Sequence, residues 1–203
     1  MVLSDVKIKE LVKEHGLLSP FDERKLQATS YDISSSSEAM VYCILDYAVD
    51  LRNRDHVETA MKKVNIGNGY HVKPGEYILV KTKEKVNMPD TLAAHIRSRT
   101  TFTRLGLIVS DQHINPSFQG YLYLGIHNVT PNIIDIYPDL SMAQVIFEKV
   151  DGPITQDRLY RMKQDAKYQG EDDFRVPQYD MLENEEKEEV DNIINKILGR
   201  TNV

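Results

Sequence analysis

The chain has 203 residues, of which 41% are hydrophobic and 28% charged, as expected for one globular domain, alone or with appendages. Its net charge of −6 argues against nucleic acid as the main ligand, because neutralising a phosphate backbone needs a concentrated basic surface. The single cysteine, Cys43, excludes an internal disulfide, and no His/Cys cluster has the spacing of a zinc site. No apolar run approaches the roughly 18 residues of a membrane span, so no membrane partner and a cytoplasmic location are expected.

The first third of the chain predicts one helix followed by short strands. Ser4 precedes an apolar helical stripe and Gly16 follows it, which are the residue types that begin and end helices. The segment "QATSYDI" is typical of a strand, and the serine run at 34–37 predicts a polar loop. Apolar and β-branched residues over 40–51 favour another strand, in which Cys43 would be part of the core. The charged stretch 52–63 fits either a loop or a short helix.

From Tyr70 onward the pattern is that of an all-β domain. Alternating apolar residues and frequent turn residues predict strands within 76–82, 92–98, 105–110, 121–128, 133–138 and 143–150. Many short, closely spaced strands indicate a sandwich, barrel or jelly roll. The chain becomes charged and irregular after Gly152, and residues 183–198 carry an apolar stripe that predicts a C-terminal helix. This helix packs either on its own oligomer or on a partner protein.

The stretch "RSRTTFTRLG", residues 97–106, is the best candidate for binding chemistry. It places Arg99 and Arg104 around the hydroxyls of Thr100 and Thr101. Guanidinium groups offer a fixed fork of donors that suits phosphate oxygens. A solvated basic turn with surface ion pairs is the alternative interpretation.

Several motifs, in preserved order from residue 1 to about 171, resemble those of deoxycytidine triphosphate deaminases. These enzymes belong to the trimeric deoxyuridine triphosphatase (dUTPase) superfamily. "SRTTFTRLGL" is similar to the family's "GRSSLxRLGL", and "INPSFQGYLYLGIHN" is similar to "IDPGFxGxxTLExxN". Further similar segments are "MVLSDVKIKELV", "LQATSYDI", "VKPGEYILVKTKEKVNMPDTLAAHI", "YPDLSMAQVIFE" and "LYRMKQDAKYQG".

The resemblance implies a mainly β fold, a distorted barrel or jelly roll of the dUTPase-like type with helices at both termini. That domain would span 1–171, followed by a charged extension over 172–203. The resemblance also implies a homotrimer with nucleotide sites at the subunit interfaces, and Mg²⁺ bound through the triphosphate of a pyrimidine deoxynucleotide. Matched position by position, the nucleotide-binding residues would be Arg99, Thr100, Thr101, Arg104, Asn115, Gln144, Tyr160 and Lys167.

The chain departs from the family at both catalytic carboxylates. Gly125 stands where the family has the Glu that activates water, and Asn115 stands where it has an Asp. An amide orients water but cannot take its proton, and glycine does neither. The family's glycines at two turns are replaced by Ser117 and Asp139, and its glutamine after "KYxG" is replaced by Glu171.

Four groups are candidates for a substitute base. Asp32 is interpreted as structural and Asp111 precedes the hairpin turn, whereas His113 and His127 flank the two vacated positions. His127 should share the strand face of Gly125, opposite Ile126.

Three functions remain open from the sequence. The chain is a dCTP deaminase-like enzyme that uses an unrecognised base, a nucleotide-binding sensor or regulator without turnover, or a structural trimer with a vestigial pocket. A dUTP diphosphatase activity is a further alternative. The first two functions are favoured over the third by four matched residues, Arg99, Arg104, Tyr160 and Lys167. Gly125 and Asn115 favour the second function over the first.

Overall fold

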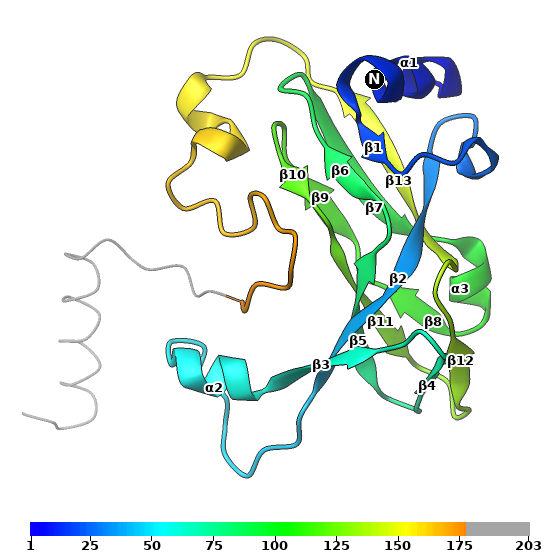
Figure 1. The fold of residues 1–203 in the computed structure, drawn as a ribbon, viewed down its shortest axis with the longest axis vertical. Helices are drawn as coiled ribbons and strands as arrows, with labels where there is room; N and C mark the ends of the chain where they lie inside the picture. Colours follow the sequence, from blue (N-terminus) through cyan, green and yellow to red (C-terminus); the bar gives the residue numbers. More distant parts are fainter. Residues whose placement is uncertain (178–203) are drawn as a thin grey trace, which may run out of the picture.

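The computed structural model describes residues 1–177, so the helix expected over 183–198 lies outside the described residues. The described chain is mainly β (Figure 1). In chain order the elements are α1 (Asp5–His15), β1 (Leu18–Ser19), η1 (Glu23–Lys25), β2 (Tyr31–Tyr42), α2 (Arg54–Thr59), β3 (Met61–Asn65), β4 (Tyr70–Val72), β5 (Tyr77–Thr82), β6 (Lys85–Asn87), β7 (Leu92–Ser98), α3 (Thr100–Arg104), β8 (Leu107–Val109), β9 (Gln112–Ile114), β10 (Gln119–Gly120), β11 (Tyr123–Asn128), β12 (Ile134–Ile136), β13 (Ser141–Lys149), η2 (Gln156–Arg158) and η3 (Tyr160–Met162).

The main sheet curls into a half-barrel, which confirms the predicted fold class. Its strand order is β8-β11-β5-β2-β13-β7-β9, with β3 also paired to β2. The end strands β8 and β9 are separated by only Ser110 and Asp111 in the chain, so the two edges of the sheet must approach each other. Two smaller sheets, β1-β6-β10 and β4-β12, complete the β structure.

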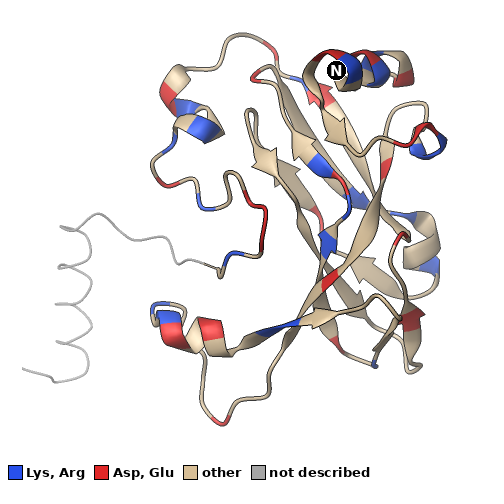
Figure 2. Ribbon diagram, in the orientation of Figure 1, with Lys and Arg blue, Asp and Glu red and all other residues tan. Residues whose placement is uncertain are grey.

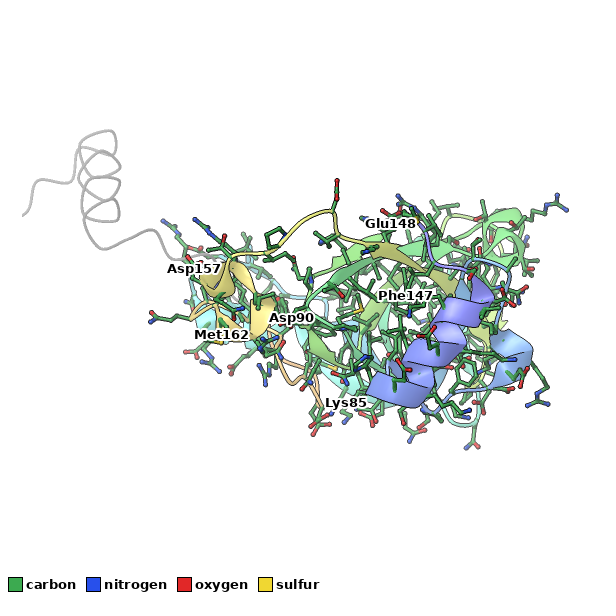
Figure 3. The ribbon with its side chains drawn as sticks, turned by 90° about the horizontal axis from the view of Figure 1, so that it is seen from above. Lys85, Asp90, Phe147, Glu148, Asp157 and Met162 are labelled. Carbon is green, nitrogen blue, oxygen red and sulfur yellow. The ribbon has the colours of Figure 1, made fainter. Side chains whose placement is uncertain are left out.

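Helix α1 forms where the sequence predicts it. Ser4 caps its N-terminus by accepting a hydrogen bond from the Lys7 amide, and Gly16 ends it with a left-handed backbone at φ 63°. Ile8 and Leu11 are buried, and the helix packs along one side of the barrel (Figure 3). Capping and one apolar stripe therefore suffice to define this element.

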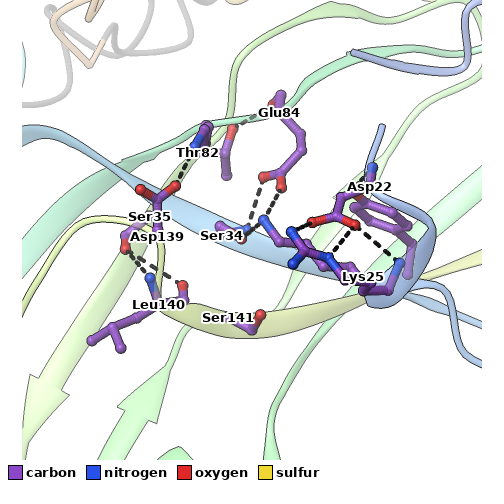
Figure 4. A network of polar contacts seen from close by, with 12 residues as sticks. Asp22, Lys25, Ser34, Ser35, Thr82, Glu84, Asp139, Leu140 and Ser141 are labelled. Atoms are coloured by element: carbon purple, nitrogen blue, oxygen red, sulfur yellow. Dashed lines mark hydrogen bonds and ion pairs between the residues drawn. The ribbon is translucent and has the colours of Figure 1, made fainter. Parts of the chain in front are cut away.

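The serine run is not a loop, contrary to the sequence prediction. Residues 34–37 continue β2, and Glu84, which is 1% exposed, holds them there (Figure 4). Its Oε2 accepts the Ser34 amide at 2.8 Å, its Oε1 lies 3.0 Å from Lys25 Nζ, and Lys25 also donates to Ser34 Oγ. The Ser35 amide donates to Leu140 O at 3.0 Å. Tertiary partners thus override the local turn preference of serine.

The predicted strand over 40–51 ends early. Strand β2 stops at Tyr42, and the chain then runs through an irregular segment to α2, which fits the short-helix alternative for 52–63. Cys43 is therefore half-buried just beyond the strand, and its assignment to a strand core was wrong. Ile44 is fully exposed, so the apolar character of this stretch does not reflect burial.

The two faces of strand β11 have different surroundings. Leu124 and Ile126 are 0% and 1% exposed and belong to the hydrophobic core. Tyr123, Gly125 and His127 lie on the opposite face, as the period-2 alternation predicts. No helix in the described part of the chain has the length and apolarity needed to cross a membrane.

Candidate functional site

One group of predicted site residues lies where β7 ends and α3 begins. Arg99 precedes α3, and its guanidinium Nη2 lies 3.2 Å from Oδ2 of Asp32. Asp32 is 3% exposed and also accepts hydrogen bonds from Gln144 Nε2 at 3.2 Å and Gln27 Nε2 at 3.3 Å. These contacts fix Arg99 and Gln144 in one place and give Asp32 a structural role. The carboxylate of Asp32 is thereby already engaged by three side chains.

Helix α3 presents the remaining predicted phosphate ligands to solvent. Phe102 is 6% exposed and anchors this single turn to the body. Thr100, Thr101 and Arg104 are exposed. The predicted turn is thus a short helix, and its polar side chains remain accessible to a ligand.

A cavity of about 380 Å³ lies at the other end of the barrel. Two predicted residues, Asn115 and Tyr160, line it. Its aromatic lining consists of Phe118, Tyr121, Tyr123, Tyr160, Tyr168 and Phe174, and its polar lining includes Gln112, His113, Asn115, Glu171 and Arg175. Flat aromatic walls with a few polar groups are typical of a pocket for a small organic ring.

Within one subunit the two groups are separate. Ala94 on β7 lies opposite Ile114 on β9, so Asn115 is near the start of β7, whereas Arg99 follows its end. Six residues of strand correspond to about 20 Å. A single chain therefore does not bring Arg99 and Asn115 together.

Residues 159–177, which follow η2 and are called the covering segment below, cover the cavity. Ser117 Oγ accepts the Arg161 amide at 3.0 Å, and the Arg161 guanidinium pairs with Asp90, next to η3 (Figure 3). Tyr160 packs on Phe118 with ring centroids 5.8 Å apart. Lys167 lies half-buried on the same segment, outside the cavity wall, and its carbonyl accepts a hydrogen bond from the Arg175 guanidinium.

Ser117 and Asp139 adopt the backbone that the family's glycines would provide. Their φ angles are 68° and 64°, in the left-handed region that disfavours residues with a Cβ. At both positions the family motifs have glycine, as noted from the sequence. The strain at Ser117 coincides with a hydrogen bond that holds the covering segment, whereas Asp139 pairs with Lys83 on the surface.

The end of the covering segment adds to the sheet edge at β10. Glu171 forms a parallel bridge with Gly120: the Tyr121 amide donates to Glu171 O and the Gly170 amide to Gln119 O, both at 2.8 Å. A Cβ on Gly120 would lie 2.9 Å from the Glu171 amide nitrogen, so this close approach needs glycine.

Lysines of β5 and β6 balance the acidic end of the segment (Figure 2). Lys81 is 7% exposed; its Nζ donates to Asp172 O at 2.5 Å and lies 4.5 Å from the Tyr121 ring centroid. Lys85 pairs with the Asp172 carboxylate. Both lysines therefore project toward the covering segment.

At Gly125 the space for a side chain is occupied. A Cβ there would lie 1.8 Å from Tyr77 Oη and 2.4 Å from Ser110 Oγ, and these two hydroxyls are 3.0 Å apart. His127 packs against the edge of the Tyr77 ring, with centroids 6.3 Å apart. The position where the family carries its Glu is thus filled by a tyrosine from the neighbouring strand.

The substitute bases proposed from the sequence differ in position. Asp111 is exposed and pairs with Arg97, and Asp32 lies in the Arg99 group. His113 borders the cavity; burial, and then the neighbouring His95, lower the pKa of its imidazole. Glu171 also lines the cavity and is a further carboxylate that was not among the candidate bases expected from the sequence. The replacement of the family's glutamine by a carboxylate was the signal that could have identified it.

No group of three or more His, Cys, Asp or Glu side chains within residues 1–177 is placed to hold a metal ion. The polar groups at the two ends of β7 suit an anion at Arg99 and a planar, hydrogen-bonding ring in the cavity.

Comparison with known proteins identifies the family. Residues 2–150 match the model described as "dCTP deaminase-like". A "dCTP deaminase, dUMP-forming" from Persephonella marina is 31% identical over 173 residues, covering 84% of this chain and 93% of that protein. A "dCTP deaminase" from Nautilia profundicola is 30% identical over 189 residues, covering 88% and 98%.

The fold has a solved counterpart. The crystal structure of 2′-deoxycytidine 5′-triphosphate deaminase from Agrobacterium tumefaciens superposes with a TM-score of 0.59 at 21% identity. The match covers 72% of this chain and 48% of that one. Taken with the motifs and the curled sheet, the family match over most of the chain shows that this protein belongs to the dCTP deaminase-like family.

Proposed function

We propose that this protein binds a pyrimidine deoxynucleoside triphosphate, with dCTP the first candidate, in deoxynucleotide metabolism. The observation that carries the proposal is the division of polar groups between the two ends of β7. The cavity with Asn115 and Tyr160 has the size and aromatic walls for a base and sugar. Arg99 and the exposed donors of α3 suit a triphosphate.

These two halves would meet in a homotrimer, with phosphate groups from one subunit facing the cavity of another. The separation of about 20 Å along β7 supports this arrangement, since one chain alone leaves each half incomplete. Such a protein would work in the cytoplasm.

Mg²⁺ would accompany the nucleotide through its phosphate oxygens, which is the usual mode for this ion. Asp32, the acid beside Arg99, is already held by Arg99, Gln144 and Gln27. The donor set therefore fits a metal carried by the ligand better than one held by protein carboxylates.

Deamination of dCTP to dUTP is the reaction that the relatives' names suggest, and hydrolysis onward to dUMP is a second. Asn115 and Gly125 leave the cavity without the two carboxylates of the family motif, so the family's usual base does not serve here. Binding without turnover, as a sensor or regulator, is the second candidate function, favoured by the filled space at Gly125.

A nucleotide panel tests the proposal. Calorimetry with dCTP, dUTP, dTTP and dATP in the presence of Mg²⁺ should give tight binding for the pyrimidines only, and light scattering should give a trimer. Product analysis on the same samples separates an enzyme from a regulator. A monomer at micromolar concentration, or no binding by any pyrimidine nucleotide, would remove the proposal.

A further inference from the structure

A carboxylic acid in the cavity wall points to an alternative source of catalysis. Among the residues of 1–177 that line the cavity, Glu171 is the one carboxylic acid. It lies on the covering segment and lines the same cavity as Asn115 and Tyr123. The chain thus lacks acids at the two positions where the family motif has them, and carries an acid where that motif has a glutamine.

The side chain of Glu171 is held in place by the fold. The residue is 6% exposed, and its backbone bridges Gly120 on β10. Its Oε1 accepts the Arg175 amide at 2.9 Å, in a turn that the Arg175 guanidinium closes on Lys167 O and Gly170 O. A carboxyl oriented by a backbone amide, in the wall of a cavity, has the fixed geometry that proton transfer requires.

We propose that Glu171 is the general acid–base residue of this protein and replaces the carboxylate missing at Gly125. The inference rests on the proposed function, since it assigns the base for a pyrimidine nucleotide bound in this cavity.

The reaction balances with water as the only co-reactant. The carboxylate takes a proton from water as the oxygen bonds to C4 of cytosine, and N3 takes up that proton. The carboxylate then removes the proton of the new hydroxyl. As the C4 carbonyl forms, the C4–N4 bond breaks and the amine leaves with this proton as ammonia. Glu171 ends ionised, as it began, and cytosine has become uracil.

The surroundings suit this role. Burial raises the pKa of Glu171, and the positive charges of Arg175 and Lys81 partly offset this rise. A raised carboxyl pKa brings the proton affinity of the group closer to neutral pH, where acid–base catalysis is most effective. Tyr123, which borders the cavity, has its pKa raised by burial and then by Glu38 and Glu171, so it stays a neutral hydroxyl.

The test compares charge removal at Glu171 with charge removal elsewhere on the segment. The full chain is assayed for ammonia and uracil-nucleotide release from dCTP with Mg²⁺, as wild type, Glu171→Gln, Glu171→Asp and His113→Gln. Asp165→Asn is the matched control, because Asp165 is exposed on the same segment and pairs with Lys163. Calorimetry measures dCTP affinity for each variant, and thermal unfolding confirms that each is folded.

We expect wild type to release ammonia and Glu171→Gln to lose about 10²-fold or more in kcat, with dCTP affinity retained. Glu171→Asp should keep part of the activity, and Asp165→Asn all of it. In wild type, kcat should fall toward acid pH as Glu171 takes up its proton, and this limb should disappear in Glu171→Gln.

Two results would overturn the assignment while leaving the proposed function intact. Wild type could bind dCTP and release no ammonia, or Glu171→Gln could turn over like wild type, with the loss appearing in His113→Gln instead. Absence of dCTP binding in every variant, wild type included, would reject the proposed function and this assignment with it.

Discussion

The two ends of β7 carry polar residues in opposite states. At the α3 end, the buried Asp32 is satisfied by Arg99, Gln144 and Gln27, so the charged groups hold one another. At the cavity end, the buried Glu171 accepts a hydrogen bond from a backbone amide and its pKa is raised by burial. A buried charge with a full set of partners builds structure, whereas one kept near a cavity remains available for chemistry. A buried carboxylate thus has one of two roles, set by its partners.

The largest expected effect follows from removing the ion pair at the α3 end of β7. Arg99→Ala leaves the Asp32 carboxylate buried without its cation, which should cost roughly 2–3 kcal/mol of unfolding free energy because Arg99 itself is partly exposed. Urea unfolding measures this loss. Arg104→Ala is the control: Arg104 is exposed, so stability should stay unchanged while triphosphate binding weakens by about 1.5–3 kcal/mol. Equal stability of the two variants would contradict the structural role given to Arg99.

The next effect concerns the vacated position beside the cavity. Gly125→Glu must displace the Tyr77 ring and its hydrogen bond to Ser110, at a cost of about 1–3 kcal/mol. The double variant Tyr77→Ala, Gly125→Glu frees that space, so the two substitutions should couple favourably in a double-mutant cycle. Recovered dCTP turnover, if the carboxylate reaches the ligand, should appear in the double variant first. Strict additivity would mean that Tyr77 does not fill the position.

Local sequence patterns predict many elements of the fold correctly, but not all of them. The alternation in 121–128 placed Gly125 and His127 on one face of β11, and Ser4 with Gly16 bounded α1, because these features depend on neighbouring residues in the chain. The loop prediction for the serine run was wrong because Glu84, 50 residues away in the chain, accepts a hydrogen bond from the Ser34 amide. Its outcome depended on a buried partner that no local window contains.

The site divides in the same way. The motifs predict four of the site residues discussed above: Arg99, Gln144, Asn115 and Tyr160. The structure places these residues in two separate groups. The motifs do not predict Glu171 as a base, since its burial arises from the bridge to Gly120 and from the approach of the covering segment. A residue whose environment is built by a distant segment gives little local signal.

A smaller effect compares the two strained turns. Asp139→Gly relieves a left-handed residue and loses a surface ion pair, for a net gain of up to about 1 kcal/mol. Ser117→Gly relieves the same strain but removes the hydroxyl that accepts the Arg161 amide, a bond of about 1 kcal/mol. We expect little change in its global stability, and faster proteolysis of the covering segment than in Asp139→Gly. Equal proteolysis rates would show that the Ser117 hydroxyl does not hold the segment.

The smallest effect is the pH dependence of the covering segment, and it depends on Glu171. Burial raises the pKa of this carboxyl above its ordinary value of 4.5, so the docked segment binds the proton more tightly than the undocked one. Docking is therefore favoured at low pH and weakens as pH rises through the raised pKa. Glu171→Gln removes this dependence and should dock more firmly than wild type at neutral pH, with the difference vanishing toward pH 4. Hydrogen exchange of the Tyr121 and Gly170 amides, which bond across the docked edge, measures docking directly. Asp165→Asn, also a loss of one acid on the segment, should follow wild type at every pH. If instead protection in wild type increases from pH 4 to 7, the charges of Arg175 and Lys81 outweigh burial at Glu171, and the carboxyl would be an ion-paired anchor like Asp32.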